Sequence, residues 1–61
     1  MTFRDVEKMI KDDGWFYVYA NGSHHYYNHS IKPGKVCIPF HAGKDINKRV
    51  VDSIKRQAGI K

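Results

Sequence analysis

The sequence is poor in cysteine and in acidic residues, and it contains no long apolar run. Cys37 is the only cysteine among 61 residues, so no disulfide can form within the chain, and a lone cysteine is typical of a reducing compartment. No run approaches the ~18 apolar residues of a membrane span, and the first residues lack the apolar core of a secretory signal. We therefore expect a soluble, cytoplasmic protein with no membrane association.

The shortage of acidic side chains leaves an uneven positive charge. Residues 1–13 carry three basic and four acidic side chains, whereas residues 14–61 carry eight basic and two acidic ones. An excess of positive charge over most of a small chain favours a polyanion, nucleic acid above all, or an acidic protein as partner. A surface that is merely soluble, with a high isoelectric point, explains the charge equally well.

The pattern of residues predicts an α+β fold. The length allows one core, so we expect a single domain over residues 1–61. A first helix should follow Thr2, which forms a capping-box pattern with Asp5, and a second should follow Asp45 as its cap and end at Gly59. Between them, three strands are predicted at residues 15–20, 23–29 and 35–39. The predicted fold class is α-β-β-β-α, a three-stranded antiparallel sheet with two helices on one face.

The dipeptide Asn21-Gly22 is the strongest short hairpin signal in the chain. A two-residue turn there sets Tyr19 opposite His24. The open face of the hairpin would then carry Trp15, Tyr17, Tyr19, His24, Tyr26 and Asn28. The helix-facing side would carry Phe16, Val18, Ala20, His25 and Tyr27, because this set holds the aliphatic residues. A β-bulge would reverse the assignment.

Metal chemistry is disfavoured by the spacing of the histidines. His24 and His25 point to opposite faces of a strand, and His25 and His29 are ~13 Å apart at ~3.3 Å per residue. The sequence contains neither Cys-x-x-Cys nor His-Glu-x-x-His. A zinc site would require the fold to bring His41 and carboxylates together, so we expect no metal. Cys37 lies in an apolar strand segment, where a thiol is normally inert.

Acid–base chemistry by a histidine is the remaining catalytic candidate. An imidazole in water titrates near pH 6.5, so it can both accept and donate a proton near neutrality. An exposed imidazole among cations could accept the 2′-hydroxyl proton of RNA or protonate the leaving oxygen. An ordinary exposed strand histidine is the competing interpretation, and chemistry alone favours it.

Four motifs along the chain carry a resemblance to a known family. They are Gly14-Trp15, Gly22-Ser23-His24-His25, Ile38-Pro39-Phe40-His41 and the segment from Lys55 to Ile60. In order and spacing, over nearly the whole chain, they resemble the HicA (YcfA-like) toxins of bacterial type II toxin–antitoxin systems. The Gly-Ser-His element is the most specific of them.

The resemblance implies a fold like a double-stranded RNA-binding domain and an endoribonuclease that cleaves mRNA without metal or cofactor. His24 would be the essential catalytic residue, Gly22 and Ser23 would position it, Tyr19 would support it, and His41 would have at most a supporting role. The partners would be mRNA and a HicB-type antitoxin that covers the active site. The toxin would be a monomer when free and a hetero-oligomer with its antitoxin.

Two positions depart from the family pattern, in which arginine is common at Tyr19 and glycine at Arg49. Tyr19 could replace a lost phosphate contact by stacking on a base, as Tyr17 and Tyr26 could also do. Arg49 favours the second helix, because glycine costs ~1 kcal/mol there. The candidate phosphate contacts, each equally explained as solvated surface charge, are Lys35, Lys44, Lys48, Arg49, Lys55 and Arg56.

Two further functions remain open at this stage. The first is a non-catalytic RNA-binding module of the same fold. The second is an interaction protein that gains its stability from a bound partner.

Overall fold

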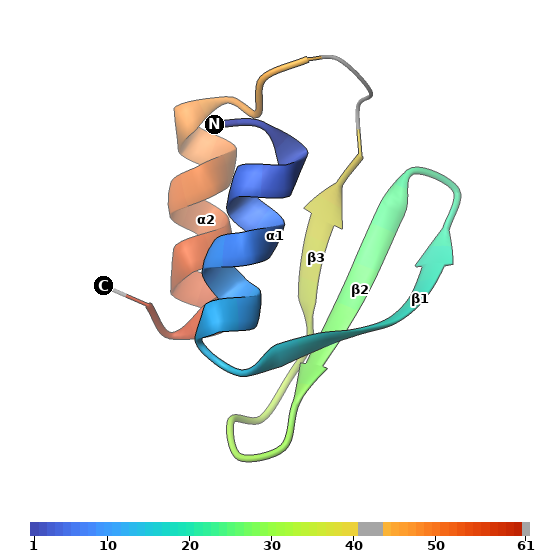
Figure 1. Ribbon diagram of the computed structural model, residues 1–61, viewed down its shortest axis with the longest axis vertical. Helices are drawn as coiled ribbons and strands as arrows, with labels where there is room; N and C mark the ends of the chain where they lie inside the picture. Colours follow the sequence, from blue (N-terminus) through green and yellow to red (C-terminus); the bar gives the residue numbers. More distant parts are fainter. Residues whose placement is uncertain (41–43, 61) are drawn as a thin grey trace.

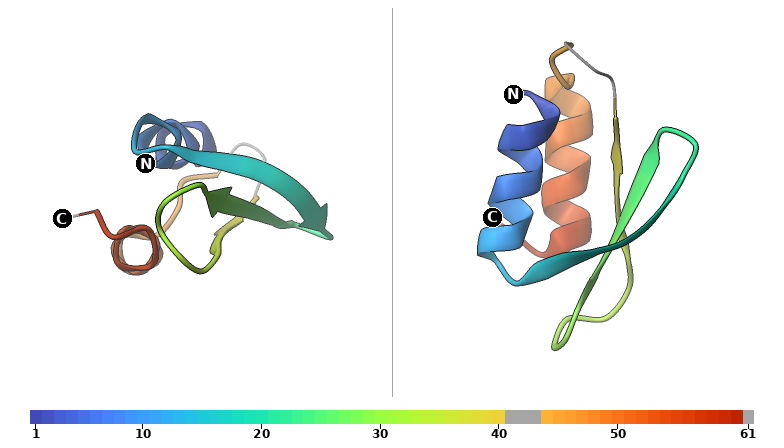
Figure 2. Two further views of the ribbon diagram at one scale, coloured as in Figure 1. Left: turned by 90° about the horizontal axis from the view of Figure 1, so that it is seen from below. Right: turned by 45° about the vertical axis from the view of Figure 1, so that its right-hand side comes forward.

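Two helices and three strands follow one another in the predicted order α-β-β-β-α (Figure 1). The computed structural model describes residues 1–40 and 44–60, so His41 lies outside the described residues. The elements are α1 (Phe3–Asp12), β1 (Trp15–Asn21), β2 (His24–His29), β3 (Val36–Pro39) and α2 (Lys48–Ala58). The sheet is antiparallel in the order β1-β2-β3, which makes β1 and β3 its edges. Both helices cover one face of the sheet, and the other face is open (Figure 2).

The first helix begins as the sequence predicts. Thr2 Oγ1 accepts a hydrogen bond from the backbone N–H of Asp5, and the Asp5 carboxylate accepts one from the N–H of Thr2. This reciprocal pair is a capping box. The hydrogen bond from the Thr2 backbone is also the main reason that the pKa of Asp5 lies below its usual value. The cap aims Val6 and Ile10, both fully buried, at the sheet.

The predicted cap of the second helix was wrong. Asn47, not Asp45, precedes α2, and its side-chain oxygen accepts from the N–H of Arg49 at 2.8 Å. Asp45 instead forms an isolated antiparallel bridge with Thr2, and the N–H of Ile46 donates to the Met1 carbonyl at 2.6 Å. This pairing holds the chain extended through Asp45, so the helix cannot begin until the next polar residue that can cap it.

The core lies between the helices and the covered face of the sheet. Its buried members are Val6, Ile10, Trp15, Tyr27, Val36, Ile38, Ile46, Val51, Ile54 and Ala58. The Trp15 indole N–H donates to the Ala58 carbonyl at 3.3 Å, 43 residues away in the chain. This bond satisfies the one polar atom of a buried tryptophan and joins the start of β1 to the end of α2.

A β-bulge at Val18 changes which side chains of β1 face the helices. Tyr17 pairs with Tyr27 and Tyr19 with Tyr26, so Val18 has no partner of its own on β2. The predicted register was therefore wrong. Trp15 was expected on the open face, but it lies on the helix side and is 2% exposed. Burial of ~200 Å² of tryptophan contributes about 5 kcal/mol at ~25 cal/mol per Å². A lost ladder hydrogen bond costs only about 1 kcal/mol, so the bulge is favoured.

The bulge also changes the positions of three neighbouring residues. Tyr17 lies on the helix side, across from Tyr27, where the open face was predicted. Phe16, across from Asn28, lies on the open face, where the helix side was predicted. Val18 was predicted to face the helices, but it is 43% exposed and lies outside the core.

The alternation of β2 was predicted correctly, because β2 pairs with β3 without a bulge. Tyr27 is buried, His25 is half-buried on the same side, and His24 and Tyr26 point to the open face. The Tyr27 hydroxyl donates a short hydrogen bond to the Glu7 carboxylate of α1. Burial of the phenol is the main cause that raises the pKa of Tyr27 well above its usual value, and the hydrogen bond to Glu7 adds to it.

Candidate active site on the open face of the sheet

The hairpin turn presents His24 at the end of β2. Asn21 pairs with His24, so the turn residues are Gly22 and Ser23, one position later than the sequence predicted. Gly22 has φ +61° and Ser23 has a negative φ, which is the pattern of a type II′ turn with glycine first. The Ser23 carbonyl accepts from the N–H of Phe40 at 2.6 Å. The residue that follows β3 therefore holds the hairpin turn in place.

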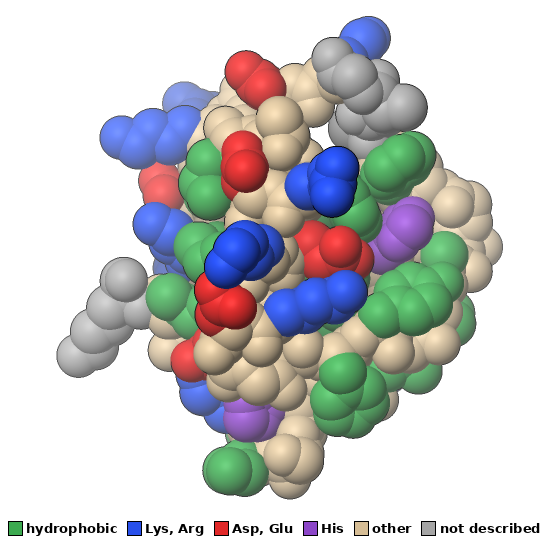
Figure 3. All heavy atoms as spheres, in the orientation of Figure 1, with side chains coloured by type: hydrophobic (Ala, Val, Ile, Leu, Met, Phe, Trp, Pro, Cys, Tyr) green, Lys and Arg blue, Asp and Glu red, His purple; other side chains and the backbone are tan. Residues whose placement is uncertain are grey.

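Hydrophobic side chains are unusually exposed along β1. Phe16, Tyr17, Val18 and Tyr19 are each between 42% and 50% exposed. In the view of Figure 3, charged side chains of both signs cover the helices, whereas hydrophobic ones gather over the hairpin of β1 and β2. Apolar surface concentrated in this way marks an interaction site more often than scattered apolar residues do.

His29 has a structural role. Its Nδ1 accepts hydrogen bonds from the backbone N–H groups of Ile31 and Lys32, both at 3.0 Å. The proton therefore lies on Nε2, which is 2.8 Å from the Asp13 carbonyl oxygen and donates to it. Both ring nitrogens are occupied in tying the β2–β3 turn to the end of α1. His29 has no free nitrogen for proton transfer.

His25 is also committed to structure, although it follows His24 directly. Its ring lies 5.0 Å from that of Phe3, 5.4 Å from that of Phe40 and 5.7 Å from that of Tyr17, measured between centroids. The residue is half-buried on the helix side of the sheet. Its role is that of an aromatic ring packed among others.

His24 differs from both. It is exposed on the open face, across from Asn21 on β1 and Pro39 on β3. Within residues 1–40 and 44–60, its imidazole takes part in no hydrogen bond, ion pair or aromatic contact. Of the three described histidines, His24 is the exposed one, and the one whose ring makes neither a hydrogen bond nor an aromatic contact with the described residues.

Tyr19 and Tyr26 form a stacked pair beside His24. They are cross-strand partners, their ring centroids are 4.8 Å apart, and their planes differ by 21°. Lys35 Nζ lies over the Tyr19 ring, 5.3 Å from its centroid, in the geometry of a cation–π contact. The structure thus brings together two of the residues that the sequence singled out, Tyr19 and Lys35, and places Tyr19 on the same face of the sheet as His24.

Comparison with known families shows to which family the chain belongs. The family model of the HicA toxin of bacterial toxin–antitoxin systems matches residues 3–60. The chain belongs to the HicA toxin family. The match runs from the first residue of α1 to the residue after Gly59, and it therefore includes the whole hairpin. A search among curated proteins found no match.

The predicted phosphate contacts of this HicA toxin are spread over both ends of the molecule. Lys48 and Arg49 form the first turn of α2, at the same end as the hairpin turn, and Lys44 comes shortly before them in the chain (Figure 1). Lys55 and Arg56 lie in the last turn of α2, at the opposite end. The fold therefore does not gather the six cations into one patch around His24.

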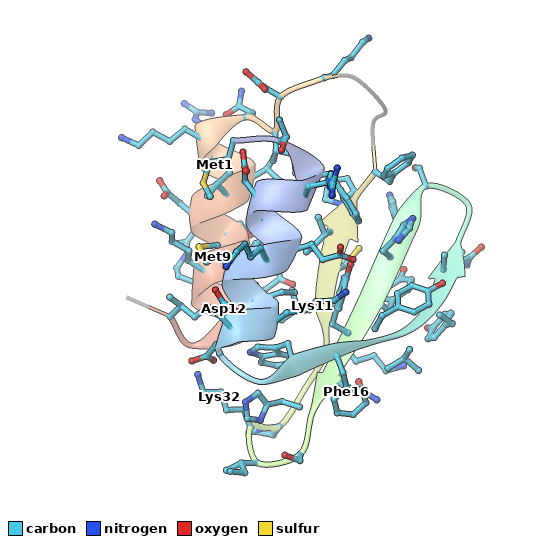
Figure 4. The ribbon with its side chains drawn as sticks, in the orientation of Figure 1. Met1, Met9, Lys11, Asp12, Phe16 and Lys32 are labelled. Carbon is cyan, nitrogen blue, oxygen red and sulfur yellow. The ribbon has the colours of Figure 1, made fainter. Side chains whose placement is uncertain are left out.

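Lys32 shows how a basic side chain can be used within the HicA fold itself. It pairs with Asp13 and donates to the carbonyl oxygens of Ala58 and Gly59, at 3.0 and 3.4 Å. Figure 4 shows its position beside the last turn of α2. The Lys32 hydrogen bond is the main reason that the pKa of Asp13 is lowered. In the described part of the chain, none of the six predicted RNA-binding cations forms an ion pair.

Three further findings concern the described residues of this family member. No three His, Cys, Asp or Glu side chains among the described residues gather as metal ligands. Cys37 is half-buried across from Tyr26, and the pKa of Tyr26 is raised by burial and by this neighbouring thiol. No helix in the described ranges is long and apolar enough to span a bilayer.

Proposed function

We propose that this HicA family toxin is an endoribonuclease that cleaves mRNA and uses His24 as its acid–base residue. The observation that carries the proposal is the contrast among neighbouring histidines. His25 and His29 are held by contacts within the fold, whereas His24 is exposed and its ring contacts none of the side chains that the structure describes. Within residues 1–40 and 44–60 the His24 imidazole has no packing or hydrogen-bonding role, and proton transfer to a substrate is chemistry that it can perform.

The reaction would use the nucleophile that RNA carries beside each phosphodiester. The 2′-oxygen attacks phosphorus, a new P–O2′ bond forms, and the P–O5′ bond breaks. The His24 imidazole takes the 2′-hydroxyl proton as base, or gives a proton to the leaving 5′-oxygen as acid. General acid–base catalysis of this kind contributes about 10²- to 10⁴-fold in rate. Neither step requires a metal, and cleavage should persist in the presence of a chelator.

The positions of Gly22 and Ser23 support this assignment. The type II′ turn fixes the start of β2, and the hydrogen bond from Phe40 to the Ser23 carbonyl fixes the turn against β3. These contacts fix the backbone that carries His24, which sets the position from which its side chain reaches the substrate. We further propose that residues 1–61 act as one toxin domain, and that it acts on mRNA in the cytoplasm.

We also propose that a HicB-type antitoxin is the partner of this toxin and binds over the open face. The exposed rings of Phe16 and Tyr19 on the open face support this, since such a surface is costly to leave in water. A bound antitoxin would also stabilise a small domain by mass action. The free toxin would be a monomer, and the inhibited complex a hetero-oligomer.

Expression of wild-type toxin beside His24→Ala tests the catalytic residue. The variant should lose growth arrest and cleave RNA at least about 100-fold more slowly. It should retain the circular dichroism spectrum of the wild type and still copurify with the antitoxin. Growth arrest and transcript loss that survive in His24→Ala would contradict the proposal.

The non-catalytic binding module makes the opposite prediction for the same proteins. It would bind RNA without cleaving it, and His24→Ala would change nothing. A substrate with a single 2′-deoxy nucleotide at the cleaved position adds a chemical check, because removal of the internal nucleophile should abolish cleavage at that position alone.

A further inference from the structure

We propose that the open face binds one unpaired RNA base on the Tyr19 ring, so that the substrate at the cleavage site is single-stranded. The inference rests on the proposed function, in that RNA is taken as the substrate. We call the site the stacking platform. It consists of the Tyr19 ring, the Tyr26 ring and the Lys35 ammonium group.

The first argument is geometric. Tyr26 and His24 are two residues apart on β2 and point to the same face, which places their Cα atoms about 7 Å apart along the strand. Tyr19, stacked on Tyr26, continues the platform onto β1. A base held on these rings would therefore lie beside the imidazole, with its own ribose and phosphate within reach of it.

The second argument concerns what Tyr19 lacks on its outer side. Because β1 is an edge strand, no strand of the sheet lies beyond Tyr19 on the side away from Tyr26. The residue remains 42% exposed despite its stacked partner. Lys35 Nζ also lies over this ring, 5.3 Å from its centroid, so a base would stack on Tyr19 by displacing this flexible side chain.

The third argument is the position of the cation. Lys35 Nζ stands over the Tyr19 ring, and no acidic side chain in the described part of the chain pairs with it. A base on Tyr19 would carry its phosphate into the neighbourhood of this charge, as in proteins that bind single strands by alternating stacking with phosphate neutralisation. Bases in a duplex are already stacked and cannot reach such a ring.

Tyr17 provides a matched control in the same strand. It is 48% exposed, close to the 42% of Tyr19, but the bulge turns it to the helix side. Its ring contacts His25 and Tyr27 and not the platform. A general effect of removing an exposed tyrosine from β1 would appear at both positions, whereas loss of stacking would appear at Tyr19 alone.

The test measures binding by fluorescence anisotropy with a labelled 2′-O-methyl oligonucleotide of about ten nucleotides, whose blocked 2′-oxygen prevents cleavage. Wild-type toxin should bind the single strand about 10-fold or more tightly than the same sequence in a hairpin duplex. Tyr19→Leu, which keeps apolar bulk but removes the ring, should weaken single-strand binding about 5- to 100-fold. Tyr19→Phe and Tyr17→Leu should bind within about twofold of wild type.

A second arm leaves the protein unchanged and so does not depend on folding of a variant. One abasic nucleotide is moved along the oligonucleotide, and for wild-type toxin one position should weaken binding about 5-fold or more. The same position should have no effect in Tyr19→Leu. Equal binding of single strand and duplex, or an abasic scan without a sensitive position, would overturn the inference.

Two outcomes separate this inference from the proposals before it. If Tyr19→Leu binds RNA as wild type does but no longer binds the antitoxin, the platform is a protein surface and the inference is wrong. If His24→Ala still cleaves RNA, the catalytic proposal is wrong, whereas the binding results on Tyr19 stand unaffected.

Discussion

Tyr17 and Tyr19 lie on opposite faces of the sheet although a single residue separates them. Tyr17 pairs with Tyr27 on the helix side, and Tyr19 stacks on Tyr26 on the open side. In a regular strand, residues two apart share a face, so the unpaired Val18 produces the difference. The bulge lets β1 bury Trp15 at one end and present Tyr19 at the other.

Deletion of Val18 should be tolerated. Tyr17 and Tyr19 would become neighbours in a regular strand, which keeps them on opposite faces and preserves every pair from Tyr19 to the turn. We expect a loss of about 1 kcal/mol in the free energy of unfolding. Deletion of Ala20 is the control, because it moves Asn21 opposite His25 and should cost about 3 kcal/mol or more. Urea denaturation measures both, and equal losses would mean that the bulge is not what sets the faces.

His25→Phe should leave the toxin active and folded. The His25 ring packs among Phe3, Phe40 and Tyr17, and a phenyl ring can fill the same place with a change in stability of about 1 kcal/mol or less. His24→Phe should abolish cleavage, since it removes the proton-transfer group at the neighbouring position. Loss of cleavage in a well-folded His25→Phe protein would show that the assignment between the two histidines is incorrect.

Gly14→Ala should strongly destabilise the fold. An added Cβ would lie 2.6 Å from His29 Nε2, and Gly14 has φ +106°. Since His29 is fixed by three hydrogen bonds, the cost should reach about 3 kcal/mol or more. Gly22→Ala is the comparison, because φ is +61° but no atom lies within 4 Å of its Cβ, which leaves a backbone cost of about 1–2 kcal/mol. Similar losses in thermal unfolding of the two variants would argue against the contact with His29.

Stability should fall at alkaline pH because of Tyr27. Burial raises the pKa of Tyr27 in the folded protein above the ordinary value of 10.0. Because the pKa is raised in the folded protein, the stability that the neutral Tyr27 phenol contributes is fully present below pH 10. It is lost as the pH rises above 10, where the phenol of the unfolded chain ionises first. Unfolding free energies between pH 8 and 11 should therefore decline in wild type and decline less in Tyr27→Phe.

The same Tyr27→Phe variant should be less stable at neutral pH. It removes the donor to the Glu7 carboxylate, and a hydrogen bond to a charged group contributes about 1.5–3 kcal/mol. Tyr26→Phe serves as the control, since its hydroxyl does not donate to a carboxylate in the described structure. An alkaline decline of the same size in Tyr27→Phe and wild type would exclude Tyr27 as its cause.

The order of elements, the hairpin, the inward face of β2 and the family resemblance could all be read from the sequence. The three structural features depend on residues close together in the chain: a capping box at Thr2, glycine next to asparagine at the turn, and strict alternation from His24 to Tyr27. The exposure of His24 followed from the same alternation. These patterns suffice because the interactions that set them span four residues or fewer.

The tertiary structure decided the bulge at Val18, the cap at Asn47 and the separate roles of the three described histidines. Trp15 is turned inward by a core and by a carbonyl that lies 43 residues away, and Asp45 is kept out of the helix by pairing with Thr2. The hydrogen bonds of His29 with Asp13 and of Lys32 with the end of α2 form only once the chain has folded. Contacts between distant residues outweigh local preference at these positions, because burial of one large side chain stabilises the fold by several times more than a turn or cap does.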